Sequence, residues 1–329
     1  DSTLRLWDKQ GNQLSIMEGH SGQVLGVTIV EDGRFLSWSD DNTLRLWNNQ
    51  GIQLAILDGH SGQVNGITAL NDGRFLSWSQ DKTLILWDKQ GAQLSTLKGH
   101  SDQVKGATVL DDGRLLSWSQ DWTLRLWSNE GIPIATLEGH SDLVDSVTIL
   151  DDGRLLSWSY DFTLRLWDIR KDPLNITEKQ SGNIIGVTSL DDGRLLSWSH
   201  DKTIRLRDNR GRLLTKMEGH SSDVVGVIAL DDGRFLSWSK DTSLRLWDKQ
   251  GKQLTKMEGH SAEVNGATIM EDGRLLSWSK DETLRLWDNQ GNSLAILEKS
   301  SQAYGVTTLK DGRFLSWSFE TITLWDKQG

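Results

Sequence analysis

The sequence predicts an all-β fold, an eight-bladed β-propeller of four-stranded antiparallel blades that is closed by strands from both termini. The tetrapeptide Leu-Ser-Trp-Ser recurs eight times at steps of 40 residues, the last step being 39. It centres on Trp38, Trp78, Trp118, Trp158, Trp198, Trp238, Trp278 and Trp317. A second recurrent motif ends in Leu-Arg-Leu-Trp, and apolar residues show no helical spacing. Because repeats of about 40 residues are typical of propeller blades, we expect residues 1–329 to form a single domain.

Each unit is predicted to contain four short strands. In the unit that spans residues 21–60, we expect strands at residues 24–30, 35–39, 43–47 and 53–60. The tetrapeptide Glu-Asp-Gly-Arg between the first two strands is a hairpin signal, since Gly33 is free to adopt a positive φ. One small sheet cannot bury both of its faces alone, so the sheets are expected to stack around an axis.

Composition and charge narrow the classes of function. The chain has 36% hydrophobic and 25% charged residues, and no apolar run approaches the ~18 residues of a membrane span. Its net charge of −10 argues against binding to nucleic acid. No cysteine is present, and we expect no metal and no cofactor. The sequence begins with Asp1 and shows no signal stretch, so we expect a cytoplasmic piece of a longer, multidomain chain.

The order of motifs within each unit resembles a known family. Gly-His, Asp-Gly-Arg, Ser-x-x-x-Asp and Leu-Arg-Leu-Trp-Asp follow one another as in WD-repeat (tryptophan–aspartate repeat) β-propellers, in the bacterial type with near-identical repeats. That family is mostly seven-bladed, and it usually has a small residue where this chain has Trp38 and its equivalents. We hypothesise that these eight tryptophans widen the gap between sheets and help to set the larger ring.

Six units contain a histidine, a serine, an aspartate and a tryptophan at matching positions. A Ser-His-Asp set suggests a hydrolase, but an enzyme needs one activated nucleophile rather than six copies. The family resemblance implies instead that each quartet is a buried, hydrogen-bonded structural tetrad. The tetrads are His20/Ser37/Asp41/Trp47, His60/Ser77/Asp81/Trp87, His100/Ser117/Asp121/Trp127, His140/Ser157/Asp161/Trp167, His220/Ser237/Asp241/Trp247 and His260/Ser277/Asp281/Trp287.

Two units depart from this pattern. The fifth has Gln180 for the histidine and Arg207 for the tryptophan, which we interpret as tolerated drift. The eighth has Ser300 for the histidine and Glu320 near the aspartate position. Two segments compete for the third strand of the last blade, residues 3–7 and residues 321–325, and the sequence leaves this choice open.

Variation between units concentrates on either side of the tetrad aspartate and beside the first apolar residue of the first strand. The histidine loop and the aspartate turn must be close if these residues are bonded, so the variable positions share one rim. The family resemblance implies that this tetrad-side (top) face, around the central channel, binds partners. We expect Trp122, Tyr160, Phe162 and His200 to be central to this surface, together with Gln120, Leu143, Asp145, Lys202, Lys240, Lys280 and Phe319.

The leading hypothesis is a non-enzymatic scaffold or sensor module that binds a protein or peptide. Exposed aromatic residues are common anchors of protein interfaces. One alternative is a carbohydrate-binding propeller, although the variable positions differ from blade to blade. A further alternative is a recently amplified or designed repeat protein with no evolved partner.

Overall fold

The computed structural model describes residues 2–8, 10–30, 32–169, 178–179, 181–298, 303–309, 312–319 and 321–326. These residues form strands and turns only, and none of them belongs to a helix that could span a membrane. The chain divides into two compact units, residues 1–175 (unit 1) and residues 176–329 (unit 2). The single domain expected for residues 1–329 stays a prediction.

Unit 1 contains the first seventeen strands. They are β1 (Leu4–Trp7), β2 (Gln13–Met17), β3 (Val24–Ile29), β4 (Phe35–Ser39), β5 (Leu44–Trp47), β6 (Gln53–Leu57), β7 (Val64–Ala69), β8 (Phe75–Ser79), β9 (Leu84–Trp87), β10 (Gln93–Leu97), β11 (Val104–Val109), β12 (Leu115–Ser119), β13 (Leu124–Trp127), β14 (Pro133–Leu137), β15 (Val144–Ile149), β16 (Leu155–Ser159) and β17 (Thr163–Trp167).

Unit 2 contains the remaining strands. They are β18 (Glu178–Lys179), β19 (Ile184–Ser189), β20 (Leu195–Ser199), β21 (Ile204–Arg207), β22 (Leu213–Met217), β23 (Val224–Ala229), β24 (Phe235–Ser239), β25 (Leu244–Trp247), β26 (Gln253–Met257), β27 (Val264–Ile269), β28 (Leu275–Ser279), β29 (Thr283–Trp287), β30 (Ser293–Glu298), β31 (Gly305–Thr308), β32 (Phe314–Trp317) and β33 (Ile322–Trp325).

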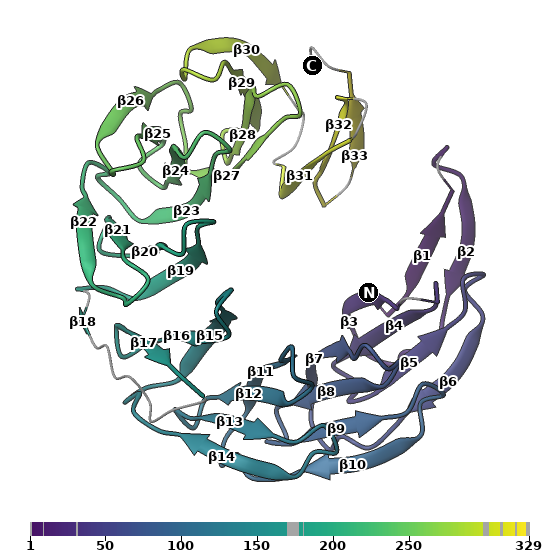
Figure 1. The fold of residues 1–329 in the computed structure, drawn as a ribbon. Coiled ribbons are helices and arrows are strands. Elements are labelled where there is room, and N and C mark those ends of the chain that lie inside the picture. Colours follow the sequence, from purple (N-terminus) through teal and green to yellow (C-terminus); the bar gives the residue numbers. More distant parts are fainter. Residues whose placement is uncertain are drawn as a thin grey trace. The chain divides into compact units, whose positions relative to one another are not determined.

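Successive strands pair in chain order and antiparallel, as in β3–β4–β5–β6. Figure 1 shows that the first strand of each such sheet lies on the inner side of its unit and the fourth on the outer side. Eight strands carry the Leu-Ser-Trp-Ser motif or its start, and each belongs to a separate sheet. The repeated four-stranded sheets agree with the predicted all-β propeller class.

The strands match the prediction closely, with three differences, of which the first is that the first strand ends at Ile29 instead of residue 30. The third strand begins at Leu44 because Thr43 donates its N–H to the carboxylate of Asp41 and belongs to the turn. The fourth strand ends at Leu57, because the chain then leaves the sheet to place His60 against the next one.

The core lies between consecutive sheets. Leu44 and Leu46 of β5 pack with Val64, Phe75 and Trp87 of the following sheet, and all five side chains are buried. The same type of cluster recurs at the next two sheet pairs of unit 1 and between the sheets of unit 2. Burial of each apolar face therefore depends on a neighbouring sheet, as expected for a repeat architecture.

The Asp-Gly-Arg turns connect neighbouring sheets as well as closing hairpins. Arg34 donates from Nε to Asp32 (2.7 Å) and from Nη1 to the carbonyl of Lys89 in the next sheet (2.6 Å). Arg74 binds the Asn129 carbonyl in the same way (2.7 Å). The fork of a guanidinium suits two simultaneous acceptors, which explains why arginine recurs here.

The second-strand tryptophans have a specific partner in their own sheet. Gly26 of β3 faces Trp38 of β4, and a Cβ at position 26 would lie 2.1 Å from Cζ2 of the ring. The ring also packs at the core between this sheet and the next. The indole thus occupies space that is free because glycine has no side chain. The hypothesis that these rings set the blade number stays a prediction.

The two ends of the chain form incomplete sheets. β1 pairs with β2, and β31, β32 and β33 form a three-stranded sheet. The third strand beside β32 is therefore β33, with Trp325 donating to Ser316 (2.8 Å), which answers the question that the sequence left open. Trp7 is 51% exposed, whereas the equivalent Trp47 is 2% exposed. Closure by strands from both termini stays a prediction.

Candidate partner-binding surface

In six sheets the side chains of the histidine, serine, aspartate and tryptophan form one hydrogen-bonded network. His20 contacts Asp41 through Nδ1 (2.9 Å) and Ser37 through Nε2 (2.8 Å), and Trp47 donates its indole N–H to Ser37 (2.9 Å). The other five quartets show the same contacts at 2.7–2.9 Å.

The serines of these quartets are structural residues and are closed to any ligand. No surface is exposed on any of the six, which are Ser37, Ser77, Ser117, Ser157, Ser237 and Ser277. A substrate therefore has no access to their hydroxyls, and a partner protein cannot touch them. The nucleophile that a Ser-His-Asp set suggests is thus a buried hydroxyl that joins a histidine to a tryptophan in each sheet.

Electrostatics indicate the proton positions in the quartets of His20 and His260. Burial lowers the pKa of His20 and His260, although the neighbouring aspartates oppose this effect. A neutral ring that donates from Nδ1 to the aspartate must accept from the serine O–H at Nε2. Burial alone would raise the pKa of Asp281, but hydrogen bonds from Thr283, Ser261 and His260 lower it to about 2. The quartet is thus a satisfied network with an anionic end.

The tetrad aspartate also shapes the turn between the second and third strands. Asp121 accepts hydrogen bonds from the N–H and hydroxyl of Thr123 (3.0 and 2.7 Å), while the N–H of Trp122 faces the carbonyl of Ser119 (3.3 Å). The residue between the aspartate and the threonine is then left-handed, with a φ of 71° at Trp122. A hairpin of this kind usually has glycine at that position.

Seven sheets place a residue other than glycine in this strained position. They are Asn42, Lys82, Trp122, Phe162, Lys202, Thr242 and Glu282, with φ between 67° and 73°. A left-handed conformation costs an ordinary L-residue about 1–2 kcal/mol. The position after the tetrad aspartate varies between units, and the fold nevertheless constrains its backbone conformation.

The variable positions of one sheet are direct neighbours. The N–H of Tyr160 donates to the carbonyl of Leu143 (3.1 Å), and Gln120 bonds Gln103 in the same way (2.9 Å). Lys82 reaches across to the next sheet, where its ammonium donates to the carbonyl of Ser101 (2.9 Å). We use the term rim surface for the residues on either side of the tetrad aspartate and those that flank the first buried residue of the first strand.

In unit 2 the rim surface carries ion pairs. Asp223 is bound by His200 Nδ1 (2.8 Å), from the preceding sheet, and by Lys240 Nζ (2.9 Å). Lys280 is paired with Glu263 (2.7 Å). The charges of Lys240 and Lys280 are therefore partly neutralised, whereas Lys202 is an exposed residue of the same surface.

Exposure distinguishes the aromatic candidates. Trp122 is 50% exposed, Tyr160 is 44% exposed and Phe319 is 88% exposed. Phe162 is only partly exposed, and so are Gln120 and Leu143. Phe162 is therefore less open to solvent than Trp122 and Tyr160.

Asp145 has a structural contact that the sequence did not indicate. The fourth unit has Ser146 where other first strands have glycine, and Ser146 faces Trp158. In the other units the tryptophan ring lies against a glycine at this position, whereas here it faces a serine side chain. Trp158 is more buried than its equivalents and donates its N–H to Asp145 (3.2 Å). Asp145 therefore accepts a hydrogen bond from a buried tryptophan and is also a residue of the rim surface.

The structure adds one aromatic residue that the sequence analysis missed. Tyr304 is exposed, and its ring meets that of Phe319 edge-on with centroids 4.5 Å apart. Its N–H donates to the carbonyl of Trp317 (2.8 Å). Tyr304 immediately precedes Gly305, as Leu25 precedes Gly26, and this spacing was the signal that could have found it.

The two atypical units keep parts of the network. In the fifth, Asp201 is bound by Thr203 Oγ1 (2.6 Å), Ser181 Oγ (3.1 Å) and Arg205 (3.0 Å), and Arg207 is buried at the tryptophan position. In the eighth, Ser316 still accepts from Trp325. Gln180, Ser300 and Glu320 lie outside the described residues.

The repeated sheets and their hydrogen-bonded quartets define a β-propeller scaffold. A family model described as "WD domain, G-beta repeat" (WD40) matches residues 11–48, 51–88, 91–128, 131–168, 211–248 and 251–288. The matches make up more than half of the chain, which therefore belongs to the WD40 family. The family model does not match β20 or β32, which are the second strands of the two atypical units.

Solved structures show the same fold. The computationally designed Ika8 protein is 24% identical, with a TM-score of 0.68 over 94% of this chain and 98% of that one. The C-terminal WD40 domain of Sif2 is 18% identical, with a TM-score of 0.66 over 92% of this chain and 95% of that one. A search of the curated proteins found no match.

Proposed function

We propose that this propeller is a non-enzymatic scaffold or sensor module that binds a protein or peptide through its rim surface. Trp122 and Tyr160 are the principal anchors, and Phe162 and Leu143 belong to the same proposed surface. WD40 propellers are typically interaction scaffolds, and the six serines that could suggest catalysis are fully buried. Unit 2 presents rim residues of its own, His200, Lys202, Lys240, Lys280 and Phe319, and we include them as candidates in their own right.

The observation that carries this proposal is the exposed indole of Trp122 at a left-handed position. An exposed tryptophan gains little from burial in the fold, and its backbone conformation is unfavourable. Strained residues cluster at ligand-binding sites, where binding offsets their cost. Large aromatic side chains contribute strongly to interfaces when a partner covers them. Tyr160, from the next sheet, supplies a second anchor of the same kind.

The sister units offer substitutions that preserve the turn. Trp122→Asn, Tyr160→Gln and Phe162→Asn introduce the residues that stand at equivalent positions as Asn42 and Gln80. A protein recovered with the wild-type chain from extracts of the native organism would be purified and its affinity measured against the triple variant. We expect affinity to fall at least about 100-fold, because each lost anchor costs ~2 kcal/mol or more.

A matched control removes exposed apolar side chains of the same unit away from the rim. Leu54, Leu94 and Ile134 lie on outer strands and are each about half exposed. The variant Leu54→Ala/Leu94→Ala/Ile134→Ala is expected to bind as the wild type does. Equal losses in both triple variants would remove the rim surface from consideration. Glycan binding that is sensitive to the rim variant would favour a carbohydrate-binding propeller instead.

A further inference from the structure

A second candidate surface lies at the opposite ends of the strands, where the first and second strands of each sheet are joined. Between the turns that follow β19 and β23 is a cavity of about 180 Å³. Leu190, Leu230 and Phe235 line it, and the side chains of Leu190 and Phe235 belong to the buried core. Drug-sized ligands occupy pockets of roughly 300 Å³ or more, so this groove suits a single side chain.

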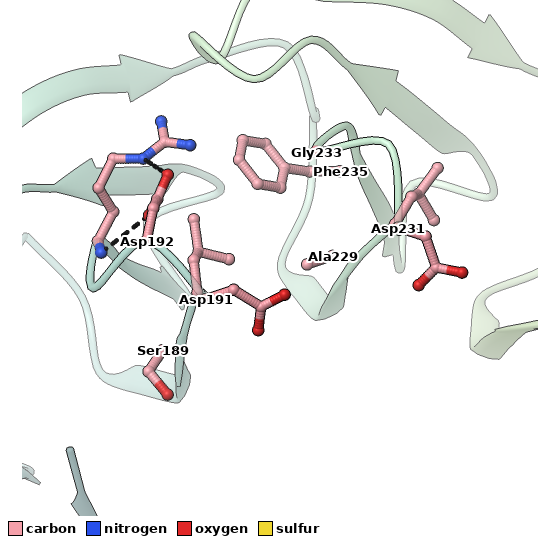
Figure 2. Close-up of a pocket in the computed structure, with 10 residues that line it drawn as sticks. Ser189, Asp191, Asp192, Ala229, Asp231, Gly233 and Phe235 are labelled. Carbon is pink, nitrogen blue, oxygen red and sulfur yellow. Dashed lines mark hydrogen bonds and ion pairs between the residues drawn. The ribbon is translucent and has the colours of Figure 1, made fainter. Parts of the chain in front are cut away.

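Two carboxylates flank this groove. Figure 2 shows Asp191 on one side and Asp231 on the other, with Phe235 set back between them. Both aspartates are exposed, and neither has an ion-pair partner within the described part of the chain. The entrance to the groove is therefore acidic over an apolar floor.

The neighbouring charges of these turns are already used within the fold. Asp192 accepts from Nε of Arg194 (2.7 Å), and Arg194 also donates to the carbonyl of Lys249 (2.6 Å). Asp232 is paired with Arg234 in the same way (2.7 Å). These arginines therefore neutralise the second aspartate of each turn and leave the charge of Asp191 and Asp231 uncompensated.

We infer that this groove binds the side chain of a lysine presented by a basic peptide or protein. A lysine carries an apolar four-carbon stem, which Leu230 and Ala229 at the entrance can cover, and an ammonium group, which the two carboxylates can hold. One corresponding groove of unit 1, between the turns that follow β3 and β7, has Asn71 in place of Asp231. This inference concerns a different face from the rim surface and does not depend on the proposed function.

The test uses the full chain and acetyl-tetralysine amide as the probe, titrated by calorimetry in low-salt buffer. We expect Asp191→Asn/Asp231→Asn to weaken binding about fivefold or more, as expected for the loss of two exposed ion pairs. The control variant Asp58→Asn/Glu138→Gln removes the same net charge at exposed positions elsewhere and is expected to change binding by less than about twofold.

A second probe separates groove binding from general attraction to an acidic chain. A tetrapeptide of 2,4-diaminobutyric acid has the same charge on shorter stems and should bind more weakly, because it cannot cover the apolar floor. Chemical-shift changes centred on Leu230 and Phe235 would support the assignment. Equal affinity for both peptides, or equal losses in the two charge variants, would overturn it. The rim triple variant should bind tetralysine as the wild type does.

Discussion

The indole ring of Trp238 lies over Gly226 on the neighbouring strand, so closely that a Cβ at position 226 would stand 2.1 Å from Cζ2 of the ring. No real Cβ tolerates such a contact, so either the ring or the strand would have to move. The first strand is also the edge of its sheet, where glycine by itself pairs poorly. The aromatic ring thus covers a weak edge position.

This relationship predicts a measurable coupling between the two residues. Gly226→Ala should lower the free energy of unfolding by about 1–3 kcal/mol, since overpacking displaces the ring. In a chain that already carries Trp238→Ala, the same change should cost much less, because the obstructing ring is gone. Urea unfolding of the four members of this cycle provides the measurement. Additive effects would show that the close contact has no energetic importance.

The hydrogen bond from Trp158 to Asp145 predicts a structural role for Asp145. Asp145→Ala should destabilise the chain by about 1–2 kcal/mol, because the buried N–H of Trp158 loses its acceptor. Lys105 occupies the equivalent position in the preceding sheet and is exposed, so Lys105→Ala should have little effect. If both variants unfold at the same urea concentration as the wild type, the hydrogen bond does not contribute to stability.

The left-handed turn position predicts a stabilising substitution. Thr242 is β-branched and has a φ of 71°, which is unfavourable for such a side chain. Thr242→Gly should therefore raise the free energy of unfolding by roughly 1 kcal/mol, after allowance for the greater freedom of glycine in the unfolded chain. Thermal unfolding would record the change. A lower midpoint would mean that the threonine makes a compensating contact.

The tetrad predicts a large loss of stability from the removal of a single hydroxyl group. Ser117→Ala removes the acceptor of the Trp127 N–H and the partner of His100, both of which are buried. Unfolding should become easier by about 1–3 kcal/mol, the cost of buried groups left unsatisfied. The side chain of Ser141 is exposed, so Ser141→Ala serves as the control and should be close to neutral. Equal midpoints for the two variants would contradict a stabilising network.

Stability should fall as the solution becomes more acidic. Burial lowers the pKa of His20 and His260 in the folded chain, so the unfolded chain binds protons more readily. Their contribution is complete above the unfolded pKa of ~6.5 and is lost as the pH falls below it. The aspartates act in the same direction below ~3.9, because the pKa of Asp201 and of Asp281 is lowered to about 2. Urea midpoints measured from pH 8 to pH 3 should stay level down to about pH 6.5, decrease as the pH falls below that value, and decrease further below about pH 4. A constant midpoint between about pH 6.5 and pH 4 would contradict this.

Much of the fold could be read from the repeat itself. A period of 40 residues with two tryptophans and a recurrent Asp-Gly-Arg turn is enough to predict sheets that bury their faces against each other. The rim could be located as well, because His20 and Asp41 can bond only if their loops meet. The partner could not be predicted, because residues such as Trp122 and Lys202 report which positions vary but not what they contact.

The sequence by itself determined the periodic elements of this protein, because strand propensity, turn residues and the tetrad spacing act over short stretches of chain. Only the tertiary structure decided how individual side chains share space between strands and sheets. It placed Trp158 on Asp145, gave Trp122 a left-handed backbone and set Asp191 opposite Asp231. The position of Asp191 opposite Asp231 depends on the packing of two neighbouring sheets. The other two features depend on how the strands and turns of one unit close on each other, which strand propensity and motif spacing do not specify.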